Sequence, residues 1–251
     1  MTSLARRAFA ISSIALLCLG CSQAGGEASE IPISCELSLS ASEIAQLQTL
    51  TVRGCGDTDV RPLGAAKALR ELVIDDPDLT DIRRLAALRS LEVLHLRRSH
   101  VADISPVGPL ERLREIVVLD TPLTNLEPLR RNTALEHVDI SDTYVLDLSP
   151  LVELPRLRTL EAARARIGSL APLAAMTALR RANLSGNGVS DVRPLLDHSA
   201  PEGLHVDLTG NCITASEPDQ AAALDELEAR GMAVYVGAQA KTCAPDSYFR
   251  R

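Results

Sequence analysis

Acidic, histidine and cysteine side chains are the groups in this sequence that could do chemistry. One set of polar residues recurs at intervals of 22 residues and could supply oxygen ligands to metal ions. Its members are Asp59, Asp81, Asp103, Asn125, Asp147, Ser169 and Asp191. The same residue types cap turns by accepting backbone hydrogen bonds, and proline follows three residues later in six of the seven segments. We therefore predict turn capping rather than metal binding.

The five histidines are His95, His100, His137, His198 and His205. In the repeat described below, His95 and His137 would lie two strands apart on one face of a sheet. That is roughly 10 Å, which is too far for the two to share a metal ion. No H-E-x-x-H, G-x-S-x-G, P-loop or G-x-G-x-x-G motif occurs. We predict no enzymatic activity, no cofactor and no metal.

The N-terminus predicts export. Arg6 and Arg7 precede an apolar segment, residues 8–20, that is shorter than the roughly 20 residues needed to span a membrane. The segment ends in Leu-Gly-Cys21 and resembles a bacterial lipobox, although Cys18 stands where that family usually has Leu or Val. The resemblance implies cleavage after residue 20 and lipidation of Cys21. A plain secretory signal is the alternative, and the paired arginines also resemble a twin-arginine export signal.

Four cysteines would remain after cleavage and lipidation, and an oxidising compartment favours disulfides between them. Cys35 and Cys55 both lie near the N-terminus, whereas Cys212 and Cys243 both lie near the C-terminus. We therefore predict Cys35–Cys55 and Cys212–Cys243 bridges. Free buried thiols are the alternative.

A 22-residue period organises residues 47–214. Leucine recurs at Leu47, Leu69, Leu91, Leu113, Leu135, Leu157 and Leu179, and two more apolar columns follow three and five residues later. Each repeat reads L-x-x-L-x-L-x-x-(N or small)-x-(L/V/I), with Asn187 and Asn211 at the asparagine position. The pattern resembles the bacterial, internalin-like class of leucine-rich repeat proteins. Elsewhere that position holds Cys55, Pro77, Ser99, Thr121, Thr143 and Ala165.

The period predicts an α/β repeat solenoid with a parallel concave sheet, because the x-L-x-L segment alternates as a half-buried strand does. Apolar residues then recur every third position, for example Ile82, Leu85 and Leu88, which predicts short 3₁₀ turns on the convex side. A solenoid needs capped ends. We expect a signal peptide (1–20), a lipid-anchor tether (21–30), an N-terminal cap (31–46), the solenoid and a C-terminal cap (215–251).

The expected caps contain recognisable elements. Residues 31–39 can supply a first strand, and a short helix follows from Ser42 to about Gln48. Residues 217–230 form an amphipathic pattern, Gly231 would end that helix, and residues 232–236 would form a final strand.

The concave face is the remaining candidate for a binding surface. Apolar residues gather at its N-terminal half with acids and histidines beside them, and we predict contact with a protein partner there. The predicted contact residues are Val73, Val93, His95, Val117, Leu119, His137, Asp139 and Glu161. The alternative is that the β-branched residues are only good strand formers facing water.

Composition restricts the function further. Aromatic residues make up 2% of the chain and the formal net charge is −7, so base stacking and phosphate binding are disfavoured and nucleic acid is not an expected partner. We predict a lipid-anchored, protein-binding scaffold of the bacterial cell envelope without enzymatic activity. A structural envelope lipoprotein or small inhibitor, in which the solenoid serves as a spacer, is the alternative.

Overall fold

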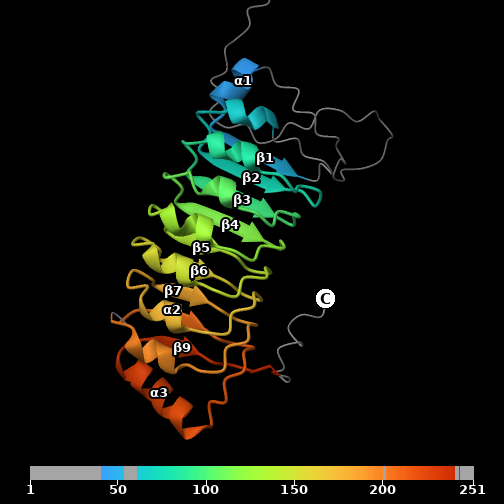
Figure 1. The fold of residues 1–251 in the computed structure, drawn as a ribbon. Helices are drawn as coiled ribbons and strands as arrows, with labels where there is room; N and C mark the ends of the chain where they lie inside the picture. Colours follow the sequence, from blue (N-terminus) through green and yellow to red (C-terminus); the bar gives the residue numbers. More distant parts are fainter. Residues whose placement is uncertain (1–40, 54–60, 200–201, 241–242, 244–251) are drawn as a thin grey trace, which may run out of the picture.

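The structure, a computed structural model, describes residues 41–53, 61–199, 202–240 and 243. In this part of the chain, nine strands form one sheet whose spatial order follows the sequence. Figure 1 shows the strands stacked along one axis, all pointing the same way, with the helical turns beside them. The strands are β1 (Thr49–Arg53), β2 (Glu71–Asp75), β3 (Val93–Arg97), β4 (Glu115–Leu119), β5 (His137–Asp139), β6 (Thr159–Glu161), β7 (Arg181–Asn183), β8 (His205–Asp207) and β9 (Ala233–Tyr235).

All eight strand pairs are parallel and in register, so equivalent positions of neighbouring repeats lie side by side. Leu50 pairs with Leu72, and Leu72 pairs with Leu94. The sequence separation between paired residues lengthens only near the C-terminus, where Arg181 of β7 pairs with His205 of β8. Each repeat is thus one rung of a solenoid, and the predicted fold is confirmed.

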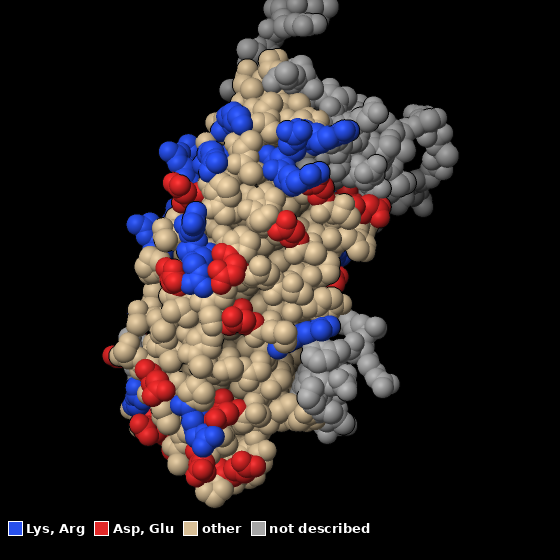
Figure 2. Space-filling view, viewed as in Figure 1, with Lys and Arg blue, Asp and Glu red and all other residues tan. Residues whose placement is uncertain are grey.

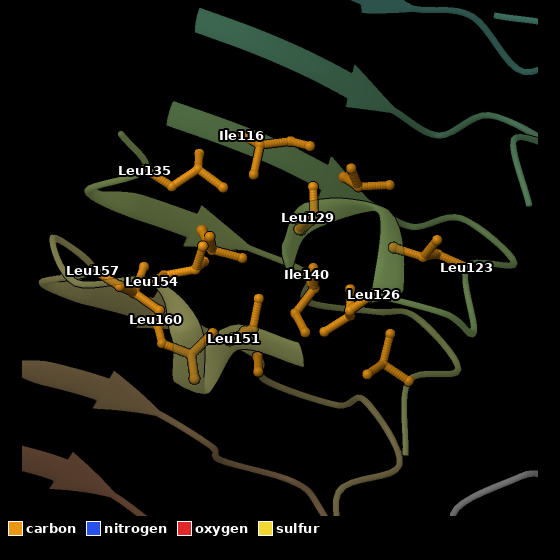
Figure 3. Packing of buried hydrophobic residues seen from close by; sticks show 14 of the residues in the cluster. Ile116, Leu123, Leu126, Leu129, Leu135, Ile140, Leu151, Leu154, Leu157 and Leu160 are labelled. Atoms are coloured by element: carbon orange, nitrogen blue, oxygen red, sulfur yellow. The ribbon is translucent and has the colours of Figure 1, made fainter. Parts of the chain in front are cut away.

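The core is one cluster of aliphatic side chains that runs through the stacked rungs (Figure 3). Leu94 and Leu96 point into it from β3 and are fully buried. Leu85 and Leu129 meet the strand residues from the turns on the other side and are also fully buried. Complete burial of a leucine side chain contributes about 1.5–3 kcal/mol, so the repeated rows account for the rigidity of the stack.

Short 3₁₀ turns follow most strands, as the period of three predicts. They are η1 (Arg61–Ala65), η2 (Arg83–Ala87), η3 (Ser105–Val107), η4 (Glu127–Arg131), η5 (Ser149–Glu153) and η6 (Arg193–Asp197). One rung differs, because its turn is a short α-helix, α2 (Ala171–Ala174). Its sequence Ala-Pro-Leu-Ala is followed by Ala175, and the high helix propensity of alanine explains the change.

Helices flank the stack at both ends. The N-terminal helix α1 (Ala41–Gln46) ends two residues before the predicted Gln48. The C-terminal helix α3 (Pro218–Ala229) lies within a residue of its predicted bounds and ends before Gly231, whose φ of +81° suits glycine. Helix α3 buries Gln220, Ala223 and Leu227 against the last rungs, and β9 then adds the final strand.

Candidate functional site

The predicted contact residues lie on adjacent strands of the concave face. Pairing of β3 with β4 places His95 beside Val117 and Arg97 beside Leu119. Val93 lies beside Glu115 in the same strand pair. These side chains therefore come from two neighbouring rungs, as the repeat predicted.

Two of the expected exposed residues are covered. Val73 is 9% exposed and Val117 is 5% exposed, so both belong to the buried residues. Val117 pairs with His95 in β3 and with Asp139 in β5, and in its own strand it lies between Glu115 and Leu119. The prediction that Val73 and Val117 are exposed was wrong. Half-buried Val93 and Leu119 supply the apolar surface instead.

His95 forms a polar network within this surface. Its Nε2 lies 2.8 Å from Oε1 of Glu115, and the Nη2 of Arg97 lies 3.3 Å from its Nδ1. Because the arginine can only donate, Nδ1 accepts and the proton sits on Nε2, which donates to the carboxylate. A neutral imidazole therefore satisfies both contacts and holds Glu115 and Arg97 in fixed positions.

The remaining predicted residues have separate surroundings on β5 and β6. Asp139 is half-buried, and its Oδ1 accepts the backbone N–H of Ser141 at 2.9 Å, so it stabilises the turn after its strand. Glu161 lies 3.9 Å from the Nε of Arg181 across the sheet. The side chain of His137 forms no hydrogen bond with another described residue and is half-buried.

The polar residues that recur every 22 residues between Asp59 and Asp191 cap the turns. Six of its members accept the backbone N–H two residues further on, at 2.7–3.2 Å: Asp81, Asp103, Asn125, Asp147, Ser169 and Asp191. The Arg83 side chain, bonded to Asp81, lowers the pKa of that carboxyl to about 2. Arg193 and Gln220 hold the pKa of Asp191 well below its usual range. The capping prediction is confirmed at these six positions, and Asp59 lies outside the described residues.

Charges on the flanks of the solenoid are mixed. Arg70 pairs with Glu92 at 2.8 Å, and Arg114 pairs with Glu136 at 2.7 Å, each between neighbouring rungs. Figure 2 shows acidic and basic side chains interspersed among neutral ones on the face in view. Exposed pairs of this kind contribute about 0.2–1 kcal/mol each, so they support the stacking register.

A second surface, which the repeat pattern did not predict, lies where the strands end. A groove of about 710 Å³ runs along this edge, lined by residues that follow β2 to β7. We call it the edge groove. One residue in each rung from β3 to β6 has a left-handed backbone although it is not glycine: Arg98, Asp120, Asp142 and Arg164, with φ of +49°, +53°, +57° and +51°. The small residues at the asparagine position were the sequence signal for this surface.

Two arginines of the edge groove form bidentate ion pairs with carboxylates. Arg98 donates to Asp75 at 2.8 and 2.6 Å. Arg164 donates to Asp142 at 2.8 and 2.5 Å. Fork-to-fork pairs of this kind fix both side chains, so they define the walls of the groove.

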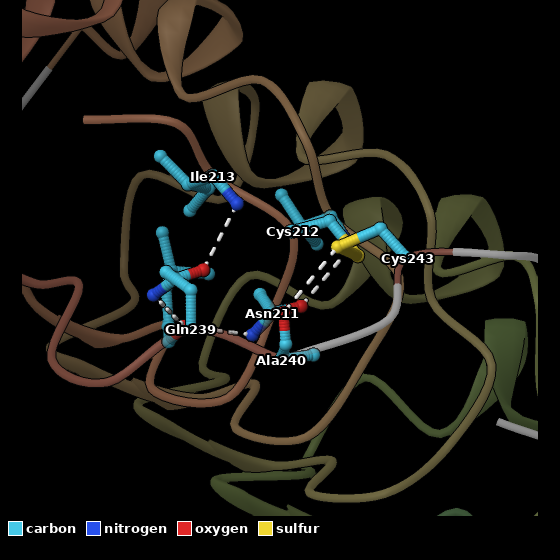
Figure 4. The surroundings of a disulfide bond; sticks show 8 residues. Asn211, Cys212, Ile213, Gln239, Ala240 and Cys243 are labelled. Carbon is cyan, nitrogen blue, oxygen red and sulfur yellow. Dashed lines mark hydrogen bonds between the residues drawn. A yellow bond between two sulfur atoms is a disulfide. The ribbon is translucent and has the colours of Figure 1, made fainter. Parts of the chain in front are cut away.

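The structure joins Cys212 to Cys243 in a disulfide, with their Cα atoms 5.5 Å apart (Figure 4). The bridge ties the end of the C-terminal cap to the loop after β8. Cys21, Cys35 and Cys55, together with the predicted strand 31–39, lie outside the described residues.

Neither a metal centre nor a membrane span emerges from the described part of the chain. No group of three His, Cys, Asp or Glu residues there could hold a metal ion. No helix there is long and apolar enough to cross a membrane.

The parallel sheet, the 3₁₀ turns and the 22-residue register define a leucine-rich repeat solenoid. The fold is similar to the crystal structure of internalin C2 from Listeria monocytogenes, with 27% identity and a TM-score of 0.58 over 64% of this chain and 81% of that one. It is also similar to internalin F from the same organism, at 21% identity and a TM-score of 0.60. That match covers 80% of this chain and 64% of internalin F. No protein-family model matches the sequence, and no curated protein matches it.

Proposed function

We propose that this chain is a non-enzymatic scaffold that binds another protein through its concave sheet. The observation that carries the proposal is the surface formed by half-buried Val93 and Leu119 next to the fixed Glu115–His95 pair. Protein interfaces combine an apolar contact area with polar groups around it. The similarity to internalin C2 is consistent with a scaffold of this kind.

The charges of this surface favour a basic partner. Glu71 is exposed at the start of β2, and Glu115 carries one carboxylate oxygen bonded to His95. Asp139 and Glu161 contribute further negative charge, although each already has a contact within the chain. Complementary charge would steer the partner and fix its orientation.

The test replaces Val93 and Leu119 together by serine, because both are half-buried and their loss leaves the core intact. The matched control replaces the exposed arginines Arg112 and Arg131, on turns outside the sheet, by serine. Capture of envelope proteins by the folded variants is then quantified. We expect at least tenfold weaker capture by the concave variant alone, as for loss of interface anchors. Equal capture by both variants would contradict the concave site and favour a spacer role.

We further propose that Cys21 is lipidated and anchors the exported chain to a bacterial membrane. The support is the sequence Leu-Gly-Cys after a short apolar segment. Cys21→Ala should move the protein from the detergent phase to the aqueous phase in fractionation, and Cys18→Ala serves as the control. Retention of Cys21→Ala in the detergent phase would refute lipid anchoring.

A further inference from the structure

We propose that the C-terminal cap opens reversibly in mildly acidic solution and that His198 is the residue that senses the acid. The part of the cap concerned is helix α3 with strand β9, which together cover the last rung of the solenoid. His198 directly follows the turn η6, against which α3 packs. None of the residues proposed to contact a protein partner lies on this turn, so the proposal does not depend on the concave site.

His198 occupies a position of the repeat that belongs to the core. The earlier rungs place Ala66, Leu88, Leu110, Asn132, Leu154 and Met176 there, at intervals of 22 residues. All of these side chains are buried, and His198 is 0% exposed. None of the earlier residues can take up a proton, so the last rung alone puts an ionisable ring at this core position.

The surroundings of His198 favour the neutral imidazole. Burial lowers the pKa of His198, because a charged ring would lose its hydration there. A hydrogen bond with the backbone of Met176 raises the pKa, whereas the positive charges of Arg230 and Arg180 lower it further. The closed cap therefore resists protonation of this ring.

His198 is also a point of attachment for α3. Arg230, which directly follows the helix, donates from Nη2 to the carbonyl oxygen of His198 at 2.9 Å and from Nη1 to that of Leu196. A protonated His198 ring would add a second positive charge near the guanidinium that holds the helix in place. The acids on the same elements, Asp197 and Glu226, are exposed, so solvent screens their charges and they offset this repulsion weakly.

Opening of the cap would therefore take up a proton. In the open form His198 meets water, where a histidine has a pKa of about 6.5, whereas in the closed form its pKa is lower. The closed form has its full stability above about pH 6.5 and loses stability as the pH falls below that value. One proton taken up on opening raises the equilibrium constant of opening by about tenfold per pH unit, until the pKa of the closed form is reached.

The open form would expose apolar side chains that the closed form buries. Ala223 and Leu227 lie on the covered face of α3, and Leu195 lies in the turn beneath it. Mild acid would thus uncover an apolar surface at the end of the solenoid that is closed at neutral pH.

The experiment measures hydrogen exchange of the full chain by mass spectrometry at pH 7.5 and pH 5.5. Exchange rates are divided by the intrinsic rates at each pH, so that only the opening of the structure is compared. We expect the protection of amides in α3 and β9 to fall by about tenfold at pH 5.5. The protection of amides in β6 should stay the same.

Substitution of His198 decides whether it is the sensor. His198→Leu and His198→Met place there the residues of earlier rungs, and both variants should keep α3 equally protected at the two pH values. His205→Gln removes an exposed histidine of β8, the strand that pairs with β9, and should retain the wild-type change. Equal protection of wild type at both pH values, or the same acid-dependent loss in His198→Leu and His198→Met, would overturn the proposal.

Discussion

The side-chain oxygen of Asn187 accepts a hydrogen bond from the backbone nitrogen of Ile167, 3.0 Å away in the preceding rung. Asn211 repeats the contact with Val189 at 3.0 Å. One rung further on, in the C-terminal cap, Oε1 of Gln239 accepts a hydrogen bond from the backbone nitrogen of Ile213 at 2.9 Å. The side chains at the asparagine position thus form a ladder of contacts between rungs, the asparagine ladder. A glutamine from a different segment continues this ladder into the cap.

Asn187→Ala should lower the free energy of unfolding by about 2–3 kcal/mol. The substitution leaves the Ile167 N–H and the Ala162 carbonyl buried without their side-chain partner. Ser99→Ala at the equivalent position is the control and should not lower stability, because its buried hydroxyl forms no hydrogen bond with described residues that the substitution could break. Urea unfolding followed by circular dichroism compares the two, and equal losses would contradict the ladder.

The Cys212–Cys243 bridge should stabilise the protein by about 3–4 kcal/mol, as expected for a closed loop of about 30 residues. We expect Cys243→Ser to lower the urea midpoint accordingly. Peptide mapping of the purified protein without reductant should recover the two cysteines in one linked pair. Recovery of Cys243 as a free thiol would show that the bridge does not form.

Acid should weaken the attachment of the C-terminal cap. Arg193 and Gln220 hold the pKa of Asp191 low in the folded protein. The ionised carboxylate therefore makes its full contribution to the free energy of unfolding above about pH 4, the usual pKa of Asp, and this contribution is lost as the pH falls below that value. Asp191→Asn should therefore be less stable than wild type at pH 7, and the difference should shrink at pH 2–3. A constant difference between Asp191→Asn and wild type at every pH would disprove the linkage.

Asp120→Gly should raise the free energy of unfolding by up to about 1 kcal/mol. Its φ of +53° strains an aspartate but not a glycine, and its carboxylate has no partner to lose among the described residues. Arg164→Gly relieves the same strain but removes the ion pair with Asp142, so its gain should be smaller. Thermal unfolding ranks the two variants, and destabilisation by Asp120→Gly would contradict the strain argument.

The spacing of the leucines was sufficient to predict the fold, because each column recurs at a fixed interval and only stacking buries it. Local rules also located the capping residues, as Asp103 before Pro106 illustrates. Exposure was harder to predict, because the repeat places Val117 on the concave face but does not tell how far the side chains around it cover it. Gln239 could not have been assigned to the ladder, because its position follows from how the cap folds back onto β8.

The unbroken register from β1 to β7 makes chain length equivalent to distance along the solenoid. Removing or duplicating one 22-residue unit, such as residues 115–136, would shift everything beyond it by one strand spacing of about 4.8 Å. Each retained side chain would keep its face, because the repeat returns to the same position. The distance between the two capped ends can therefore be changed in fixed steps without redesigning the core.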